Sequence, residues 1–176
     1  MGKYQEALTE AMTWLGNKKD TLFIGQAVEY KGTAMTGTLV DVPDEKKIEL
    51  PVMEETQMGM TVGLTIAGYR PISIFPRWNF LICGTNQLVN HLDKLELMAP
   101  EFPRGAIIRV GVGAEKPIHP QHQHVGDFTK AFSLLCPHTF IEELNDPEKI
   151  VKAYKAAYKR NRPSLMVEWG DYYNEK

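Results

Sequence analysis

The chain has 176 residues, a length typical of one domain, so we expect residues 1–176 to form a single unit. Twenty basic and 22 acidic side chains leave a formal net charge of −2, which argues against nucleic acid or an anionic membrane as the main partner. No stretch approaches the ~18 apolar residues of a membrane span. Two cysteines, Cys83 and Cys136, are too few for a disulfide framework, so we expect reduced thiols and a cytoplasmic location.

Helical and strand-like patterns alternate along the chain. Helical spacing of apolar residues, or a good helix start, predicts helices at 3–17, 55–67, 78–98, 127–135 and from Pro147 onward. Short apolar runs predict buried strands at 21–28, 48–53, 70–75, 106–113, 138–141 and 164–169. Residues 30–47 are typical of a surface loop. The alternation predicts a three-layer α/β fold, a mostly parallel six-stranded sheet with helices on both faces.

Ligands of such sheets bind beyond the carboxyl ends of the strands. Glu54 lies at one such end, just before a predicted helix, where an acid can simply compensate the helix dipole. Phe75, Trp78 and Phe80 follow the next strand, where aromatic residues are commonly part of the core. Together, the acid and the aromatic residues favour a slot for a flat nitrogen heterocycle.

The segment from Pro51 to Asn90 carries a specific pattern without a gap. It contains Pro51-Val-Met-Glu54, then Gly59 and Gly63, then Ala67-Gly-Tyr-Arg-Pro71, and finally Asn86-Gln-Leu-Val-Asn90. With Phe75 and Trp78, these residues resemble the pyrimidine-binding domain of thiamine-diphosphate enzymes. The beta subunits of 2-oxoacid dehydrogenase first components are most similar, and transketolases are more distant. The family has Asp where Asn86 stands. The resemblance extends over essentially the whole chain and implies the thiamine-diphosphate-binding fold of the pyrimidine type.

The resemblance assigns roles to the residues at the strand ends. Glu54 matches the acid that hydrogen-bonds the aminopyrimidine ring and favours its imino tautomer, which makes Glu54 both a catalytic and a cofactor-binding residue. Trp78, with Phe75 and Phe80, is expected to stack on that ring. Gln26 falls where the family often has the first acid of Gly-Glu-Glu-Val, so a cofactor contact there is changed or lost.

A histidine-rich loop follows the fourth predicted strand. His119, His122 and His124 lie close enough in sequence to suggest zinc, but no nearby Cys or acid completes a ligand set, so we expect no metal in this chain. The alternative without a functional role is that these histidines belong to a solvated polar loop. The resemblance implies that one histidine moves protons on the reaction intermediate; the spacing to Phe128 favours His124, and the local Pro-Gln-His sequence favours His122. Arg77 suits either an acidic substrate or a surface ion pair.

The diphosphate motif of the family, Gly-Asp-Gly followed by Asn-Asn, does not occur in this chain. The 176 residues also contain no counterpart of the C-terminal domain of the beta subunits. The resemblance therefore implies an alpha-type partner subunit that holds the diphosphate of thiamine diphosphate and Mg²⁺, a heterotetramer, and activity only in the complex. The expected reaction transfers an acyl or aldehyde unit from a small carbonyl substrate, a 2-oxoacid or a ketose. A two-chain 2-oxoacid decarboxylase and a noncatalytic assembly subunit, which Gln26 favours, are the alternatives.

Overall fold

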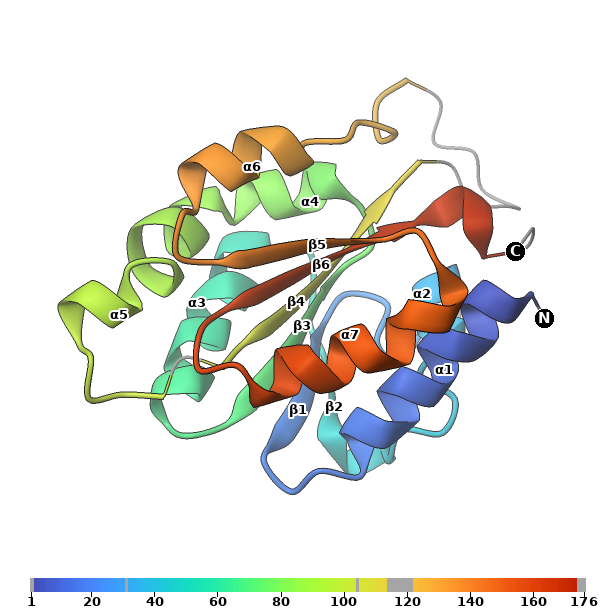
Figure 1. Cartoon of the computed structure of the whole chain (residues 1–176), viewed down its shortest axis with the longest axis horizontal. Helices are drawn as coiled ribbons and strands as arrows, with labels where there is room; N and C mark the ends of the chain where they lie inside the picture. The colour runs from blue at the N-terminus through green and yellow to red at the C-terminus, as the bar shows by residue number, and fades with distance from the viewer. Residues whose placement is uncertain (1, 31, 104, 114–121, 174–176) are drawn as a thin grey trace.

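The fold is built on one open sheet, seen edge-on in Figure 1. The structure is a computed structural model that describes the chain except residues 1, 31, 104, 114–121 and 174–176. Six strands pair in the order β2-β1-β3-β4-β6-β5, and all of the pairs are parallel. The strands are β1 Thr21–Gly25, β2 Lys47–Glu49, β3 Arg70–Phe75, β4 Ile107–Val112, β5 Phe140–Leu144 and β6 Ser164–Trp169. The predicted α/β class and all six predicted strands are confirmed.

Helices cover both faces of the sheet (Figure 1). One face carries α1 (Lys3–Gly16) and α7 (Pro147–Lys159), and the other carries α3 (Glu54–Ile66), α4 (Trp78–Cys83) and α6 (Thr129–Leu135). Neighbouring strand residues point to opposite faces, so Ile107 belongs to one core cluster and Ile108 to the other. This two-sided burial explains why the strands are continuous apolar runs rather than alternating ones.

Helix boundaries follow local signals at both ends. The Asp146 side chain accepts a hydrogen bond of 3.1 Å from the backbone N–H of Glu148, and Pro147 occupies the first helical position of α7. Gly68 follows α3 with a φ of +92°, the left-handed conformation that closes a helix without a steric penalty for glycine. Both boundaries were predicted from the sequence.

The predicted helix over 78–98 is interrupted. Three pieces replace it: α4, a π-helical turn at Gln87–Leu92 and α5 at Leu95–Met98. Gly84 ends the first piece next to the start of α3, where a Cβ would lie 3.1 Å from the backbone oxygen of Glu54. Within the predicted loop over 30–47, the chain forms the single turn α2 (Ala34–Gly37) and a 3-10 turn (Asp44–Lys46).

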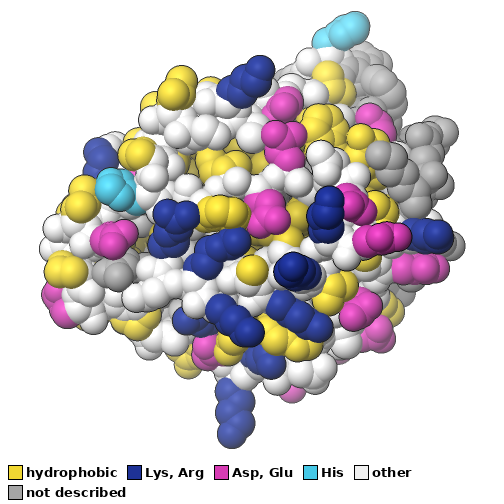
Figure 2. Space-filling view, in the orientation of Figure 1, with side chains coloured by type: hydrophobic (Ala, Val, Ile, Leu, Met, Phe, Trp, Pro, Cys, Tyr) yellow, Lys and Arg dark blue, Asp and Glu magenta, His cyan; other side chains and the backbone are white. Residues whose placement is uncertain are grey.

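The outer surface of α7 is basic. Figure 2 shows Lys and Arg side chains gathering over this helix. Among the described residues, no helix is both long and apolar enough to cross a bilayer.

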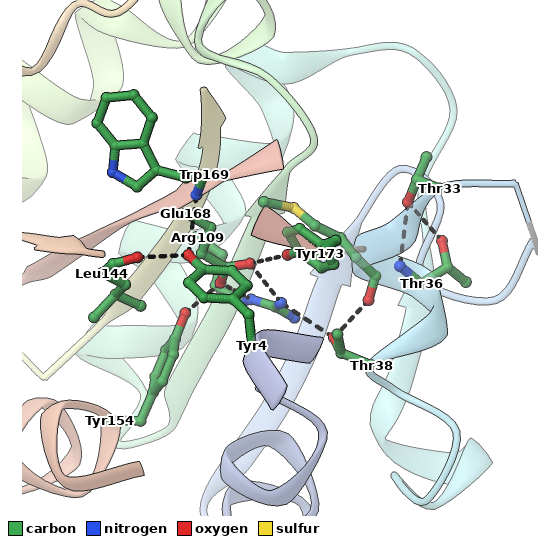
Figure 3. Close-up of polar contacts among 11 residues, drawn as sticks. Tyr4, Thr33, Thr36, Thr38, Arg109, Leu144, Tyr154, Glu168, Trp169 and Tyr173 are labelled. Atoms are coloured by element: carbon green, nitrogen blue, oxygen red, sulfur yellow. Dashed lines mark hydrogen bonds and ion pairs between the residues drawn. The ribbon is translucent and has the colours of Figure 1, made fainter. Parts of the chain in front are cut away.

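A buried ion pair links β4 and β6 beneath α1 and α7 (Figure 3). The Arg109 Nε donates to Glu168 Oε1 at 2.6 Å, and its Nη2 donates to Glu168 Oε2 at 2.9 Å. Nη2 also donates to Thr38 Oγ1 at 3.1 Å, which ties the segment after α2 to the sheet. Neither charged side chain has any exposed surface. This buried bidentate contact therefore holds β4, β6 and the segment after α2 in one arrangement.

Three tyrosines, which we call the tyrosine cluster, surround the carboxylate of Glu168 (Figure 3). The Tyr154 hydroxyl donates to Glu168 Oε1 at 2.5 Å, and the Tyr173 hydroxyl donates to Oε2. The third member, Tyr4, donates to the Leu144 carbonyl at 2.6 Å. Burial, and then the negative charge of Glu168, raise the pKa of each of these phenols well above 10.

Candidate cofactor site

The candidate site lies where the connections leave the sheet in opposite directions. From β1 the chain runs to β2 on one side, and from β3 it runs to β4 on the other, so β1 and β3 flank the switch point. Crevices at such points, outside the carboxyl ends of the strands, bind ligands in open α/β sheets. Gln26 follows β1, Glu54 begins the helix after β2, and Trp78 follows β3.

Glu54 and Gln26 touch each other at this edge. Glu54 is the first residue of α3 and is 8% exposed, so it is buried rather than a solvated helix cap. The side-chain amide of Gln26 donates from Nε2 to Glu54 Oε1 at 3.0 Å. Among hydrogen bonds between described residues, none uses Glu54 Oε2. A neutral amide therefore orients the carboxylate without adding a second negative charge, and one oxygen keeps its acceptor capacity.

A second carboxylate fixes the loop that carries Gln26. The Glu49 side chain accepts hydrogen bonds from the backbone N–H groups of Ala27, Val28 and Glu29 at 2.7–2.8 Å. Ala27 adopts a left-handed conformation with φ +54°, which an L-residue holds only when its surroundings impose it. No motif in the sequence marks Glu49 for this role. The pairing of Gly25 with Glu49, which reveals its role, is known only from the strand register.

Two of the three predicted stacking residues are core residues. Phe75 is 1% exposed and Trp78 is 0% exposed. The Trp78 indole packs on Phe132, with ring centroids 4.8 Å apart, and on Phe128 at 6.5 Å. In this structure the Trp78 ring has no solvent-exposed surface. Phe80 is half-buried and keeps partial access.

His124 lies against Phe80. Their ring centroids are 5.1 Å apart, with an interplanar angle of 33°. His124 is half-buried and His122 is exposed, whereas His119 lies outside the described residues. The Nδ1 atom of His124 is buried and has no hydrogen-bond partner within the described chain, and the same holds for Trp78 Nε1. Because buried polar atoms normally find partners, these atoms mark an edge with unused hydrogen-bonding capacity.

Arg77 is also at this edge but is not on the surface. It is 7% exposed, and its Nη1 donates to the Gly113 carbonyl at 2.6 Å, beyond the end of β4. The guanidinium thus braces the carboxyl ends of β3 and β4 against each other. In the part of the chain that the structure describes, no group of three or more His, Cys, Asp or Glu side chains is arranged to hold a metal ion.

Comparison with known proteins gives distant relatives along most of the chain. The chain is 28% identical over 169 residues to the mitochondrial pyruvate dehydrogenase E1 component subunit beta of Caenorhabditis elegans, covering 93% of this chain and 47% of that protein. The corresponding subunit of Rickettsia bellii is 32% identical over 123 residues, covering 67% of this chain and 38% of that protein. The chain is a distant homologue of these beta subunits. No protein-family profile matches it.

Solved structures agree on the fold of this beta-subunit homologue. A split-gene transketolase, described as an inactive beta4 tetramer, superposes over 95% of this chain and 51% of that one, with a TM-score of 0.65 at 13% identity. A putative thiamin diphosphate-dependent enzyme from Mycobacterium smegmatis gives a TM-score of 0.61 at 15% identity over 94% of this chain. The chain therefore shares the fold of these two proteins, and it spans about half the length of its beta-subunit relatives.

Proposed function

We propose that this chain is the pyrimidine-binding subunit of a two-chain thiamine-diphosphate enzyme. The observation that carries the proposal is the buried Glu54 carboxylate, oriented by Gln26 at the switch point of the sheet. Homology to pyruvate dehydrogenase E1 beta subunits supports the cofactor class. An alpha-type partner would hold the diphosphate and Mg²⁺, and pairs of such heterodimers would form the heterotetramer.

The residues at the site fit an aminopyrimidine ring. Such a ring requires a carboxyl group at its edge and an apolar surface on its face, which Glu54 and Phe80 supply. When bound, the cofactor supplies a thiazolium carbon acid that becomes a nucleophile toward carbonyl carbons. Glu54 exchanges a proton with the ring edge from its Oε2 side, while Gln26 fixes Oε1. Phe75 and Trp78 then act from the core by holding the segment that presents Phe80.

His124 is proposed to handle protons on the substrate side of the site. Its ring contacts Phe80, so it lies beside the surface assigned to the pyrimidine. Its buried Nδ1 has no hydrogen-bond partner among the described residues, and a substrate oxygen that reached it would supply one. An imidazole suits this task because one ring nitrogen can donate a proton while the other accepts one. His122 is the alternative; its greater exposure makes it less suited to a site that excludes water.

The reaction proposed for the complex is transfer of an acyl or aldehyde unit from a 2-oxoacid or a ketose. Relatives named as pyruvate dehydrogenase subunits support the 2-oxoacid donor, and the split-gene transketolase supports a pyrimidine half encoded as a separate chain. Release of free carbon dioxide and aldehyde without an acceptor would instead indicate the decarboxylase.

The test compares Glu54→Gln with Glu55→Gln in the chain purified together with a partner carrying the Gly-Asp-Gly and Asn-Asn motifs. Glu55 is the neighbouring acid, is exposed, and accepts hydrogen bonds from Asn86 and Gln87 at 3.1 and 3.4 Å. We expect Glu54→Gln to lower kcat by roughly 10²-fold or more and Glu55→Gln to change it less than about threefold. Unchanged turnover in Glu54→Gln would favour the noncatalytic assembly role. Calorimetric titration with thiamine diphosphate separates loss of binding from loss of chemistry.

A further inference from the structure

The outer face of α7 carries a dense positive charge that the proposed cofactor site does not use. Between residues 147 and 162, six cations accompany a single acid, Glu148, although the whole chain has a formal net charge of −2. The cations are Lys149, Lys152, Lys155, Lys159, Arg160 and Arg162. Figure 2 shows this concentration of Lys and Arg over the helix. Because α7 lies on the sheet face opposite α3, this surface is separate from the helix that begins at Glu54.

A shallow groove runs along this face of α7. It encloses about 530 Å³, and we call it the α7 groove. Val151 and Ala156, both half-buried, form its apolar part. Lys152, Lys155 and Lys159 line it at spacings of three and four residues, which places them on one side of the helix along about 10 Å of its length. Glu148 is the one acid in the lining, so the groove keeps a surplus of positive charge.

The lysines of the α7 groove are not neutralised within the fold. Among the described residues, no ion pair involves Lys152, Lys155 or Lys159. The ammonium group of Lys155 instead lies 5.5 Å from the centroid of the Trp14 ring, and Lys18 lies 4.0 Å from the same centroid. Two cations therefore share the Trp14 ring, and their mutual repulsion is relieved by any ligand that brings negative charge.

We propose that the α7 groove is the docking site for an acidic, amphipathic segment of a partner protein. Carboxylates of the segment would pair with the three lysines, and one apolar side chain would cover Val151 and Ala156. The apolar strip between the cations favours a protein segment over a nucleic acid, whose backbone presents charge without an aliphatic side chain. The net charge of −2 also disfavours an extended polyanion, because most of the remaining surface would repel it. The inference does not depend on the proposed catalytic role.

The test uses a fluorescein-labelled peptide of about 14 residues built from Glu, Leu and Ala, with three Glu and one Leu on one helical side. Its binding to the full chain is followed by anisotropy at low and high salt. The charge-reversal variant is Lys152→Glu/Lys159→Glu. The matched control is Lys94→Glu/Lys130→Glu, which reverses two exposed lysines on α6 and beside α5. Circular dichroism establishes that both variants are folded.

We expect the groove variant to weaken binding about tenfold or more, the control to change it less than about threefold, and salt to weaken it in the wild type. A Val151→Ser variant should weaken binding severalfold while leaving the salt dependence unchanged. The proposal is overturned if the peptide does not bind, if the control loses as much affinity as the groove variant, or if a shuffled peptide of the same composition binds equally well. Tighter binding of single-stranded DNA of similar length would assign the surface to nucleic acid instead.

Discussion

Replacing Arg109 with methionine removes the cation of the buried pair while keeping most of its side-chain volume. Glu168 would retain the hydroxyl donors of Tyr154 and Tyr173 but lose two charged hydrogen bonds of 2.6 and 2.9 Å. Because both side chains are fully buried, solvent cannot replace the lost contacts. Removing one partner of such a pair costs about 3–5 kcal/mol, a large part of the ~5–15 kcal/mol that stabilises a typical domain.

The assay is urea unfolding at pH 7 followed by tryptophan fluorescence. With a slope of about 2–3 kcal/mol/M for a chain of this size, Arg109→Met should lower the midpoint by roughly 1–2.5 M. The double variant Arg109→Met/Glu168→Gln should lose less than the sum of the two single variants, by about 2 kcal/mol, because neither buried charge is left alone. Lys130→Met, on an exposed lysine, is the control and should shift the midpoint little. A loss below about 1 kcal/mol, or simple additivity, would refute the reasoning.

Three further outcomes follow from burial. At pH 8, Ellman's reagent should label Cys83, which is exposed, and reach Cys136 only after unfolding, because burial raises the pKa of the Cys136 thiol to about 12. Gly25→Ala should lower the free energy of unfolding by more than about 1 kcal/mol, since φ is +147° and a Cβ would lie 2.4 Å from a backbone oxygen of β3. Gly63→Ala, with open space around it, should instead stabilise α3 by about 0.5–1 kcal/mol. Equal unfolding midpoints of the two variants would contradict this reasoning. In an alkaline titration at 295 nm, the tyrosine cluster should stay protonated past pH 10 until the chain unfolds. The pKa of each of these phenols is higher in the folded chain than in the unfolded chain. Their contribution to stability is therefore fully present below the unfolded pKa and is lost as the pH rises through the folded pKa.

The architecture was predictable because its strands are buried on both faces. Two-sided burial makes each strand an apolar run of its own, and the intervening helices carry the 3.6-residue period. The interruption after α4 was not predictable. It depends on the approach of Gly84 to the backbone of Glu54, which lies 30 positions earlier and reaches Gly84 only in the folded chain. Local spacing contains no information about such a contact.

The candidate site was only partly visible in the sequence. The strand-end rule selected the segments of Gln26 and Glu54, but their 3.0 Å contact depends on the order of β1 and β2 in the sheet. Hydrophobicity could not tell which aromatic ring stays accessible to a ligand. Trp78 and Phe80 are only two positions apart, and packing by α6 decides which ring is covered. Glu49 was missed for the same reason: its partners are backbone N–H groups of a neighbouring loop.

The order of strands leaves the sheet with two free borders, β2 and β5. Unpaired borders are templates on which a second molecule can add its own strand and begin to aggregate. The first border is only three residues long and includes Lys47 and Glu49. The second carries Glu142 and Glu143 in succession. Shortness on one side and charged side chains on the other therefore protect this chain against strand-to-strand polymerisation.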